Sequence, residues 1–183
     1  MYKKILVISD THVPYHHRDL LPFLREAKKQ INPDKVVHGS LVYRRSLKHG
    51  IPKAYLKHYN DFLQVGKGWQ WHDDLTLKTP LGPVYFCHGK VADVLTLAQS
   101  MGMSCVQGHY HSSFNIKFYG NSLGLYYGLQ VGCLIDKDSL AFRYNKTQRA
   151  RPIIGCAGII DGLPKLIPMV LDKNGRWIGK LYT

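Results

Sequence analysis

Short apolar runs recur along the chain at the length expected of buried strands. Residues 5–8 read Ile-Leu-Val-Ile and 84–87 read Val-Tyr-Phe-Cys, while 35–38 and 104–107 each hold two apolar residues between polar ones. Runs of this length that are rich in β-branched and aromatic residues favour a buried strand over a helix. We therefore predict a strand at each of the four positions.

Apolar residues at helical spacing lie between these runs. They predict helices over 20–29, with Pro22 near the first turn, over 52–65, and over 91–101 directly after His88-Gly89. The first amides of this last helix would then be placed to bind an anionic group such as a phosphate.

The C-terminal half predicts further strands. Two are expected within 114–134, broken at Gly120-Asn121-Ser122, and Asp172-Lys173-Asn174-Gly175 predicts a hairpin turn between the last two strands.

Polar clusters follow three of the predicted strands. They are Asp10-Thr11-His12, His88-Gly89 and Gly108-His109-Tyr110-His111. In an extended chain Asp10 and His12 point to the same side, where a carboxylate and an imidazole can bind one cation. A single Asp-x-His or His-x-His arises often by chance, and a lone histidine is more often a surface or capping residue. Three clusters after three strands favour a metal site at one sheet edge.

Composition is that of an ordinary globular protein. The 183 residues suit one domain over 1–183, with 45% hydrophobic and 20% charged residues. No apolar run approaches the roughly 18 residues that cross a membrane, and the chain enters a strand at once without a signal-peptide region. We expect a cytoplasmic protein with no membrane partner.

The four cysteines are single and lie in apolar contexts. Cys87, Cys105, Cys133 and Cys156 form no Cys-x-x-Cys pair. A zinc knuckle or a redox pair is therefore disfavoured, and small buried hydrophobic residues are the better interpretation.

The order Asp-x-His, His-Gly, Gly-His-x-His resembles the calcineurin-like metallophosphoesterases. The resemblance covers most of the chain and implies an α/β fold, a four-layer αββα sandwich with two mixed sheets. It also implies two divalent ions, which imidazole and carboxylate ligands allow to be Mn, Fe, Zn or Ni. Carried over by residue, it assigns the first ion to Asp10, His12 and His111, and the second to His88 and His109.

The chain departs from the family after residues 35–38. Ser40 stands where the family has a metal-bridging Asp in Gly-Asp-x-x-Asp, Tyr43 stands at the second Asp, and no Asn-His pair exists in the sequence. The family's Asn-His histidine helps to protonate the leaving group. Because that histidine is absent from this chain, no catalytic residue is assigned here. Either the bridge has been lost, or an internal segment is missing near residues 39–40. We favour the missing segment, because 41–48 read like the helix that follows the Gly-Asn-His turn.

A basic excess is the second informative feature. The 25 Lys and Arg against 12 Asp and Glu give a formal charge of +13, which favours a polyanionic partner with salt-sensitive binding. The basic residues recur in three clusters: Arg25, Lys28 and Lys29; Arg44, Arg45 and Lys48; Lys146, Arg149 and Arg151. His16, His17, Arg44 and Arg45 are candidates for substrate binding, although a solvated loop is the plainer interpretation of His16-His17.

These observations predict a metal-dependent phosphoesterase, a phosphodiesterase or phosphatase. Two ions would orient a metal-bridging hydroxide toward phosphorus. The compact, basic chain resembles phage and bacterial phosphoesterases, some of them nucleases, so DNA or RNA is the leading substrate and the host cytoplasm the place of action if the protein is phage-encoded. The alternatives are a catalytically impaired nucleic-acid-binding or scaffold protein that retains the fold, and a single-metal enzyme built on Asp10, His12 and His111.

Overall fold

Two mixed β-sheets form the centre of the molecule in the computed structural model, which describes residues 1–12, 15–39, 72, 74–136 and 150–182. The first sheet has the strand order β2-β1-β8-β9 and the second has the order β3-β4-β5-β7-β6. The elements are β1 Lys4–Ser9, α1 Leu20–Ile31, β2 Lys35–Gly39, β3 Asp74–Thr79, β4 Gly82–Cys87, α4 Val94–Met101, β5 Ser104–Gln107, β6 Phe114–Asn121, β7 Gly124–Val131, β8 Gly155–Ile160 and β9 Leu163–Pro168.

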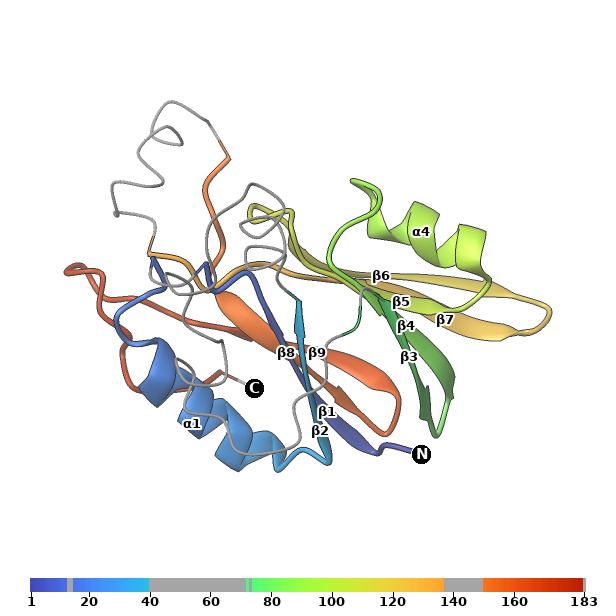
Figure 1. Cartoon of the computed structure of the whole chain (residues 1–183), viewed down its shortest axis with the longest axis horizontal. Helices are drawn as coiled ribbons and strands as arrows, with labels where there is room; N and C mark the ends of the chain where they lie inside the picture. Colours follow the sequence, from blue (N-terminus) through green and yellow to red (C-terminus); the bar gives the residue numbers. More distant parts are fainter. Residues whose placement is uncertain (13–14, 40–71, 73, 137–149, 183) are drawn as a thin grey trace, which may run out of the picture.

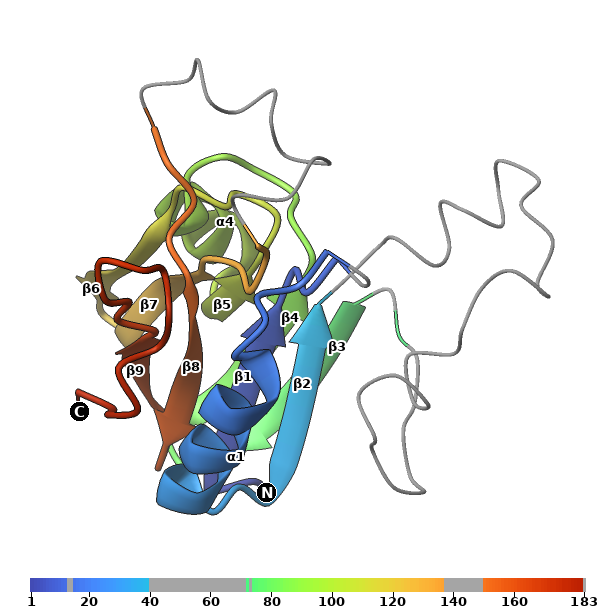
Figure 2. The same cartoon turned by 90° about the vertical axis from the view of Figure 1, so that its left-hand side faces the viewer.

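The layers follow from alternation along the strands. In β1, Ile5 and Val7 face the second sheet, while Leu6 and Ile8 face α1. The two sheets therefore share one apolar core, and α1 covers the outer face of the first sheet as α4 covers that of the second (Figures 1 and 2). The expected four-layer αββα sandwich with two mixed sheets is confirmed.

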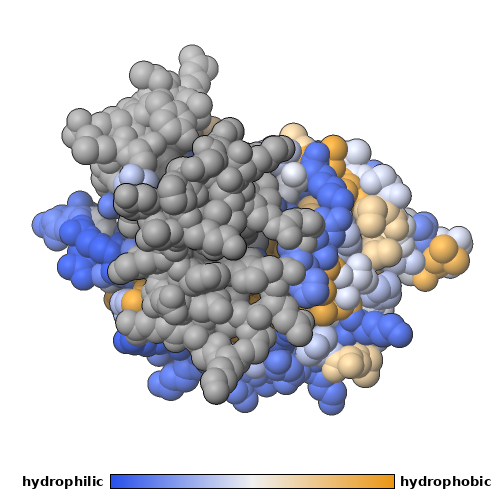
Figure 3. Space-filling model, in the orientation of Figure 1, coloured by the Kyte–Doolittle hydropathy of each residue, from blue (hydrophilic) through white to orange (hydrophobic). Residues whose placement is uncertain are grey.

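The second sheet extends past the first at its β6–β7 hairpin (Figure 1). Figure 3 shows apolar surface at the tip of this hairpin, where Leu123 and Leu125 are exposed.

The carboxyl ends of four strands point to the same end of the molecule (Figure 2). β1 and β2 run parallel in the first sheet, and β4 and β5 run parallel in the second. The expectation of three strands delivering ligands at one sheet edge was incomplete, because β1 belongs to a different sheet from β4 and β5. The candidate site lies where two sheets meet.

Several predicted elements need correction. The helix expected over 91–101 begins at Val94, after Asp93, whose carboxylate accepts a hydrogen bond from Leu95 N. A negative side chain thus caps the amides that were expected to bind an anionic group such as a phosphate. The helix predicted over 52–65 lies outside the described residues, as does the segment 41–48.

The turn at 172–175 exists, with Gly175 N donating to the carbonyl of Asp172, but it does not join the last two strands. It is flanked by a single bridge between Leu171 and Trp177. The last two strands are β8 and β9, which turn at Asp161-Gly162. No helix among the described residues combines the length and apolar character needed to cross a bilayer.

The C-terminal segment is anchored to the start of α1 by one buried carboxylate. Asp19 accepts two hydrogen bonds from the Arg176 guanidinium, at 2.8 and 2.6 Å, and one from Trp177 N. The Trp177 ring packs edge-on against Phe23 at 5.6 Å. The Arg176 guanidinium, with Trp177 N, lowers the pKa of Asp19 to about 2 despite partial burial.

We expect Asp19→Asn to lower the free energy of unfolding at pH 7 by about 2 kcal/mol, the usual size of a charge-assisted pair. Because the folded pKa lies below the unfolded value of about 3.9, the wild-type advantage is present at neutral pH and is lost as pH falls from about 4 to 2. Urea unfolding at pH 7 and at pH 2 measures the difference. Glu26→Gln, at an exposed 4.0 Å contact with Lys29, is the control and should change stability little. A difference that does not shrink in acid would contradict the assignment.

Candidate metal centre

The carboxylate of Asp10 lies at the centre of the site and is 1% exposed. Its Oδ2 accepts hydrogen bonds from Ser9 Oγ and from His109 N, both at 2.6 Å. The backbone is fixed as well: Asp10 N donates to the carbonyl of Gly39, and the Asp10 carbonyl accepts from Leu134 N. Asp10 thus links β1 to β2 and to the loop after β5.

The other carboxylate oxygen, Oδ1, faces three imidazoles. The Nε2 atoms of His12, His88 and His111 lie 3.3, 3.4 and 3.5 Å from it. The His12 and His111 Nε2 atoms are 3.2 Å apart. One carboxylate oxygen of Asp10 and one ring nitrogen each of His12 and His111 all lie within 4.8 Å of one another.

His109 completes the cluster from its outer side. Its ring lies 5.2 Å from that of His88, centroid to centroid, and 5.2 Å from that of Tyr110. All five residues that the resemblance assigned to metals are therefore gathered at one place.

Three of these residues have a left-handed backbone. Asp10, His12 and His109 have φ of 46°, 44° and 70°, and only two other non-glycine residues in the described part of the chain have positive φ. Such conformations cost free energy in residues with a Cβ and concentrate at functional sites. They also correct a prediction: Asp10 and His12 converge through two left-handed residues, not through the alternation of an extended strand.

Two glycines allow the site to close. A Cβ on Gly108 would overlap Ser9 Oγ and lie 2.7 Å from Asp10 Oδ2, and a Cβ on Gly89 would lie 2.5 Å from the His109 Cβ. Because neither position has a side chain, the segment after β4 passes close to His109 at Gly89. The segment after β5 passes close to Asp10 at Gly108.

Electrostatics favour a cation at this centre. Burial raises the pKa of Asp10, but the imidazoles of His111, His12 and His88 outweigh it and hold the pKa well below its usual range. Burial lowers the pKa of His88 and takes that of His38 to about 4, so both are neutral at pH 7. The centre then holds an ionised carboxylate at Asp10, with the neutral rings of His88 and His38 among its neighbours.

Oδ1 of Asp10 tests whether a metal fits. It is buried and has no hydrogen-bond partner, although three imidazole nitrogens lie within 3.5 Å. Burying an unpaired charged oxygen is costly, whereas a divalent cation among carboxylate and imidazole ligands removes that cost. The residues present fit a metal ion.

The structure describes two of the four candidates for substrate binding, His16 and His17. Arg44 and Arg45 lie outside the described residues, as do Ser40 and Tyr43. His16 forms an isolated β-bridge with Ile135.

His17 is corrected to a structural residue. It is 3% exposed, its Nδ1 accepts from Asp19 N, and its Nε2 donates to the carbonyl of Gly175. Both ring nitrogens are used inside the protein, so none remains for a phosphate. His38, near the end of β2, pairs with the Thr11 hydroxyl at 3.3 Å and packs inside the protein.

The cysteines agree with their interpretation. Cys105, Cys133 and Cys156 are buried, Cys87 is partly buried, and all four are free thiols. Burial raises the pKa of each.

The sequence analysis missed Ser9 and Gln107. Both are polar residues at the carboxyl ends of strands, directly before the polar clusters that hold the candidate metal ligands, and this position could have identified them from the sequence. Ser9 orients the Asp10 carboxylate, and Gln107 accepts a hydrogen bond from Lys90 N, two residues after His88.

Comparisons with known proteins place the fold. No family model matches the sequence and no curated protein matches it. Among solved structures, Vps29 from Chaetomium thermophilum matches with a TM-score of 0.55 and 13% identity over 100% of this chain and 94% of that chain. The same protein complexed with the RaPID-derived cyclic peptide RT-D3 has a TM-score of 0.51 and 14% identity over the same shares. An archaeal phosphodiesterase has 16% identity over 98% of this chain and 99% of that chain, with a TM-score of 0.45, too low to establish a shared fold. The matches to Vps29 establish the fold alone, that of a metallophosphoesterase-like α/β sandwich.

We expect Gly108→Ala to disrupt the site, because its Cβ would displace Ser9 and the Asp10 carboxylate. The positions of Ser9 Oγ and the Asp10 carboxylate would shift and the melting temperature would fall by several degrees, as for a loss of about 1–3 kcal/mol. Gly39→Ala is the matched control: it also ends a strand beside the site, but its Cβ would lie 3.6 Å from Ser9 Oγ and 3.7 Å from His88 Nδ1, ordinary contacts. Thermal unfolding of both variants measures the difference, and equal melting temperatures would contradict the packing described.

Proposed function

We propose that the protein is a metal-dependent phosphoesterase. The observation that carries the proposal is the buried Oδ1 of Asp10, which has no hydrogen bond and faces the Nε2 atoms of His12, His88 and His111. The metallophosphoesterase-like fold supports the same interpretation.

The ligands divide between two divalent ions in this proposal. Asp10, His12 and His111 hold the first, and their close approach supports the assignment. His88 and His109 hold the second, with His88 near enough to Asp10 to share its carboxylate. When bound, such ions neutralise charge on phosphate oxygens and activate water at neutral pH. Manganese, iron, zinc and nickel all suit this ligand set.

The protein prepares this site before any ion arrives. Ser9 Oγ and His109 N fix Oδ2 of Asp10, which leaves Oδ1 directed at the imidazoles. The backbone hydrogen bonds of Asp10 to Gly39 and Leu134 fix the position of the main chain from which the carboxylate projects. Ligands held in this way need little reorganisation on binding.

Nucleic acid is the substrate that we favour, as a phosphodiester. A formal charge of +13 attracts a polyanion, and Arg25, Lys28 and Lys29 are exposed on α1. In keeping with this substrate we place the protein in the cytoplasm, that of the host cell if it is phage-encoded.

A second candidate is a binding protein that keeps the fold without turnover. Two observations favour it: Ser40 occupies the position of a family metal ligand, and the similar Vps29 from Chaetomium thermophilum binds a cyclic peptide. Under this alternative the histidine cluster still binds a cation, but no ester is hydrolysed.

We further propose that the natural protein is one domain with an internal segment, near residues 39–40, that the 183-residue chain lacks. We expect the protein from its natural source to exceed 20.9 kDa by the mass of a few tens of residues, and the 183-residue chain to be poorly active by comparison. Intact-mass spectrometry measures this. A natural mass of 20.9 kDa would mean that the junction is genuine and would favour the binding protein.

The histidine cluster should be needed for both metal binding and hydrolysis. We expect His111→Ala to weaken Mn²⁺ binding and to lower turnover of a phosphodiester such as bis(p-nitrophenyl) phosphate roughly a hundredfold, because loss of a ligand removes several kcal/mol of transition-state stabilisation. His72→Ala is the control, since His72 is an exposed histidine outside the cluster.

Calorimetric titration with MnCl₂ and a hydrolysis assay on the wild type and both variants separate the alternatives. Mn²⁺ binding with no hydrolysis of mono- or diesters, in the longer chain as well, would support the binding protein. Absence of Mn²⁺ binding in the wild type would reject both proposals.

A further inference from the structure

A row of polar side chains crosses the second sheet at a single register. In the hydrogen-bonded ladders each member lies beside the next on the neighbouring strand. From β3 to β6 the row reads Asp74, Cys87, Gln107, Gln130 and Asn115. Three of these are amides, which is unusual where a sheet is covered by a helix.

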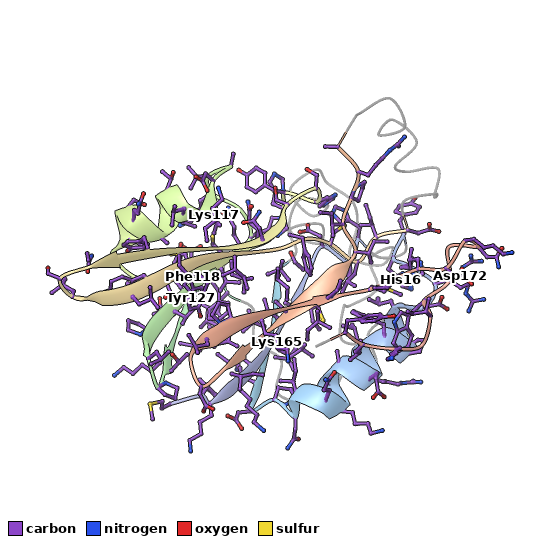
Figure 4. All side chains as sticks on the ribbon, turned by 180° about the vertical axis from the view of Figure 1, so that it is seen from behind. His16, Lys117, Phe118, Tyr127, Lys165 and Asp172 are labelled. Carbon is purple, nitrogen blue, oxygen red and sulfur yellow. The ribbon has the colours of Figure 1, made fainter. Side chains whose placement is uncertain are left out.

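The row faces the α4 side of the sheet. Cys87 packs with the cluster beneath α4, and side chains one residue away along a strand must point to the opposite face. Figure 4 shows this alternation on β6, where Lys117 lies on the α4 side, whereas Phe118 and its cross-strand neighbour Tyr127 lie on the side of the first sheet. The segment 88–93, which joins β4 to α4, is bonded along this row.

Each residue from 90 to 93 is tied to the sheet. Lys90 Nζ pairs with Asp74 at 2.8 Å, and Lys90 N donates to Gln107 Oε1 at 3.2 Å. Gln107 Nε2 donates to the carbonyl of Val91 at 2.7 Å. Further along, Gln130 Nε2 donates to the carbonyl of Ala92, and Lys117 pairs with Asp93. The backbone after His88 is therefore fixed at successive residues.

Gln107 differs from the other members in what it connects. It is 1% exposed, and both ends of its amide are bonded to the backbone of residues 90 and 91. It also directly precedes Gly108 and His109 in the chain. One rigid side chain thus joins the segment that carries His88 to the segment that carries His109. A buried amide costs free energy unless it is fully bonded, so an apolar residue would fill the position at lower cost.

The fit between the two segments leaves little room for error. Gly89 passes so close to His109 that a Cβ would lie 2.5 Å from the His109 Cβ, and the two imidazole rings are 5.2 Å apart. A shift of the 89–91 backbone by a fraction of an ångström would change the separation of the His88 and His109 nitrogens, to which metal affinity is sensitive.

We infer that Gln107 is a positioning residue that sets His88 against His109 for the second metal ion. The inference rests on the proposed function, in which these two histidines hold that ion. Residues that orient ligands from outside the first coordination sphere affect metal affinity by about 10- to 100-fold.

The test compares Gln107→Met with Gln130→Met. Methionine has nearly the length of glutamine but makes neither amide hydrogen bond. Gln130 is a matched control because it is 3% exposed and bonds the same segment, but at Ala92, four residues after His88. Circular dichroism and thermal unfolding first establish that both variants fold. A third variant, Gln107→Glu, keeps the acceptor for Lys90 N and loses the donor to Val91.

Mn²⁺ alone is the probe, read by electron paramagnetic resonance and by amide hydrogen exchange. We expect Gln107→Met to weaken binding of the second Mn²⁺ about tenfold or more, so that the spectrum of a spin-coupled pair gives way to that of an isolated ion. The first Mn²⁺ should bind as in the wild type. In the metal-free variant the Lys90 amide should exchange faster. The affinity of Gln107→Glu for the second Mn²⁺ should lie between those of the wild type and Gln107→Met. Gln130→Met should keep the spectrum of the spin-coupled pair.

Two outcomes would overturn the inference and leave the proposed function intact: a wild-type coupled spectrum in Gln107→Met, or equal losses in Gln107→Met and Gln130→Met. If the wild type itself gives no coupled pair at any Mn²⁺ concentration, the two-ion assignment fails, and the inference fails with it.

Discussion

The buried charge of Asp10 is the constraint on which the rest of the site depends. Removing a carboxylate from water costs several kcal/mol unless its oxygens are bonded or paired. The protein offers strong donors to one oxygen only, from Ser9 and the backbone of His109, and surrounds the other with imidazole nitrogens. This asymmetry explains why the segments after three strands converge on one residue. Each segment brings a donor or an imidazole that contacts one of the two carboxylate oxygens of Asp10. It also explains the left-handed backbone at Asp10, His12 and His109, because no extended strand end brings side chains so close.

The site also joins two sheets whose facing sides pack together through apolar side chains. Asp10 extends β1 in the first sheet, while His88, His109 and His111 follow strands of the second. Apolar packing in the cluster that contains Val7 of β1 and Val106 of β5 fixes the distance between sheets but is not directional. The hydrogen bond from His109 N to Asp10 is directional, and so would be the coordination of a cation by ligands from both sheets. The core therefore sets the separation of the sheets, and the polar groups at their carboxyl ends set the alignment that the chemistry needs.

Much of this was predictable from the sequence, for identifiable reasons. The strands at 5–8, 84–87 and 104–107 are apolar and short, and their patterns are local. The polar clusters after them were visible too, since strand ends are where such residues collect. What failed depends on long-range contacts: His17 looked like a loop residue until Gly175 supplied its partner, and α4 starts late because Asp93 caps it. The row of amides could not be inferred, because Gln107 and Gln130 become neighbours only through the sheet register.

Metal binding and turnover are separable consequences of this architecture. The unbonded oxygen of Asp10, the left-handed residues and the close approach of Gly108 all cost stability, and a protein that used the fold only as a surface would gain by relaxing them. A cation offsets these costs whether or not an ester is hydrolysed, so both candidate functions require it. Hydrolysis further requires groups that act on the leaving oxygen. In the family that the chain resembles, those groups come from the motifs that are absent around Ser40, whereas Ser9 and the backbone of β2 hold Asp10 in place here. An enzyme and a binding protein built on this fold therefore share the need for the ion and differ in the groups that act on the leaving oxygen.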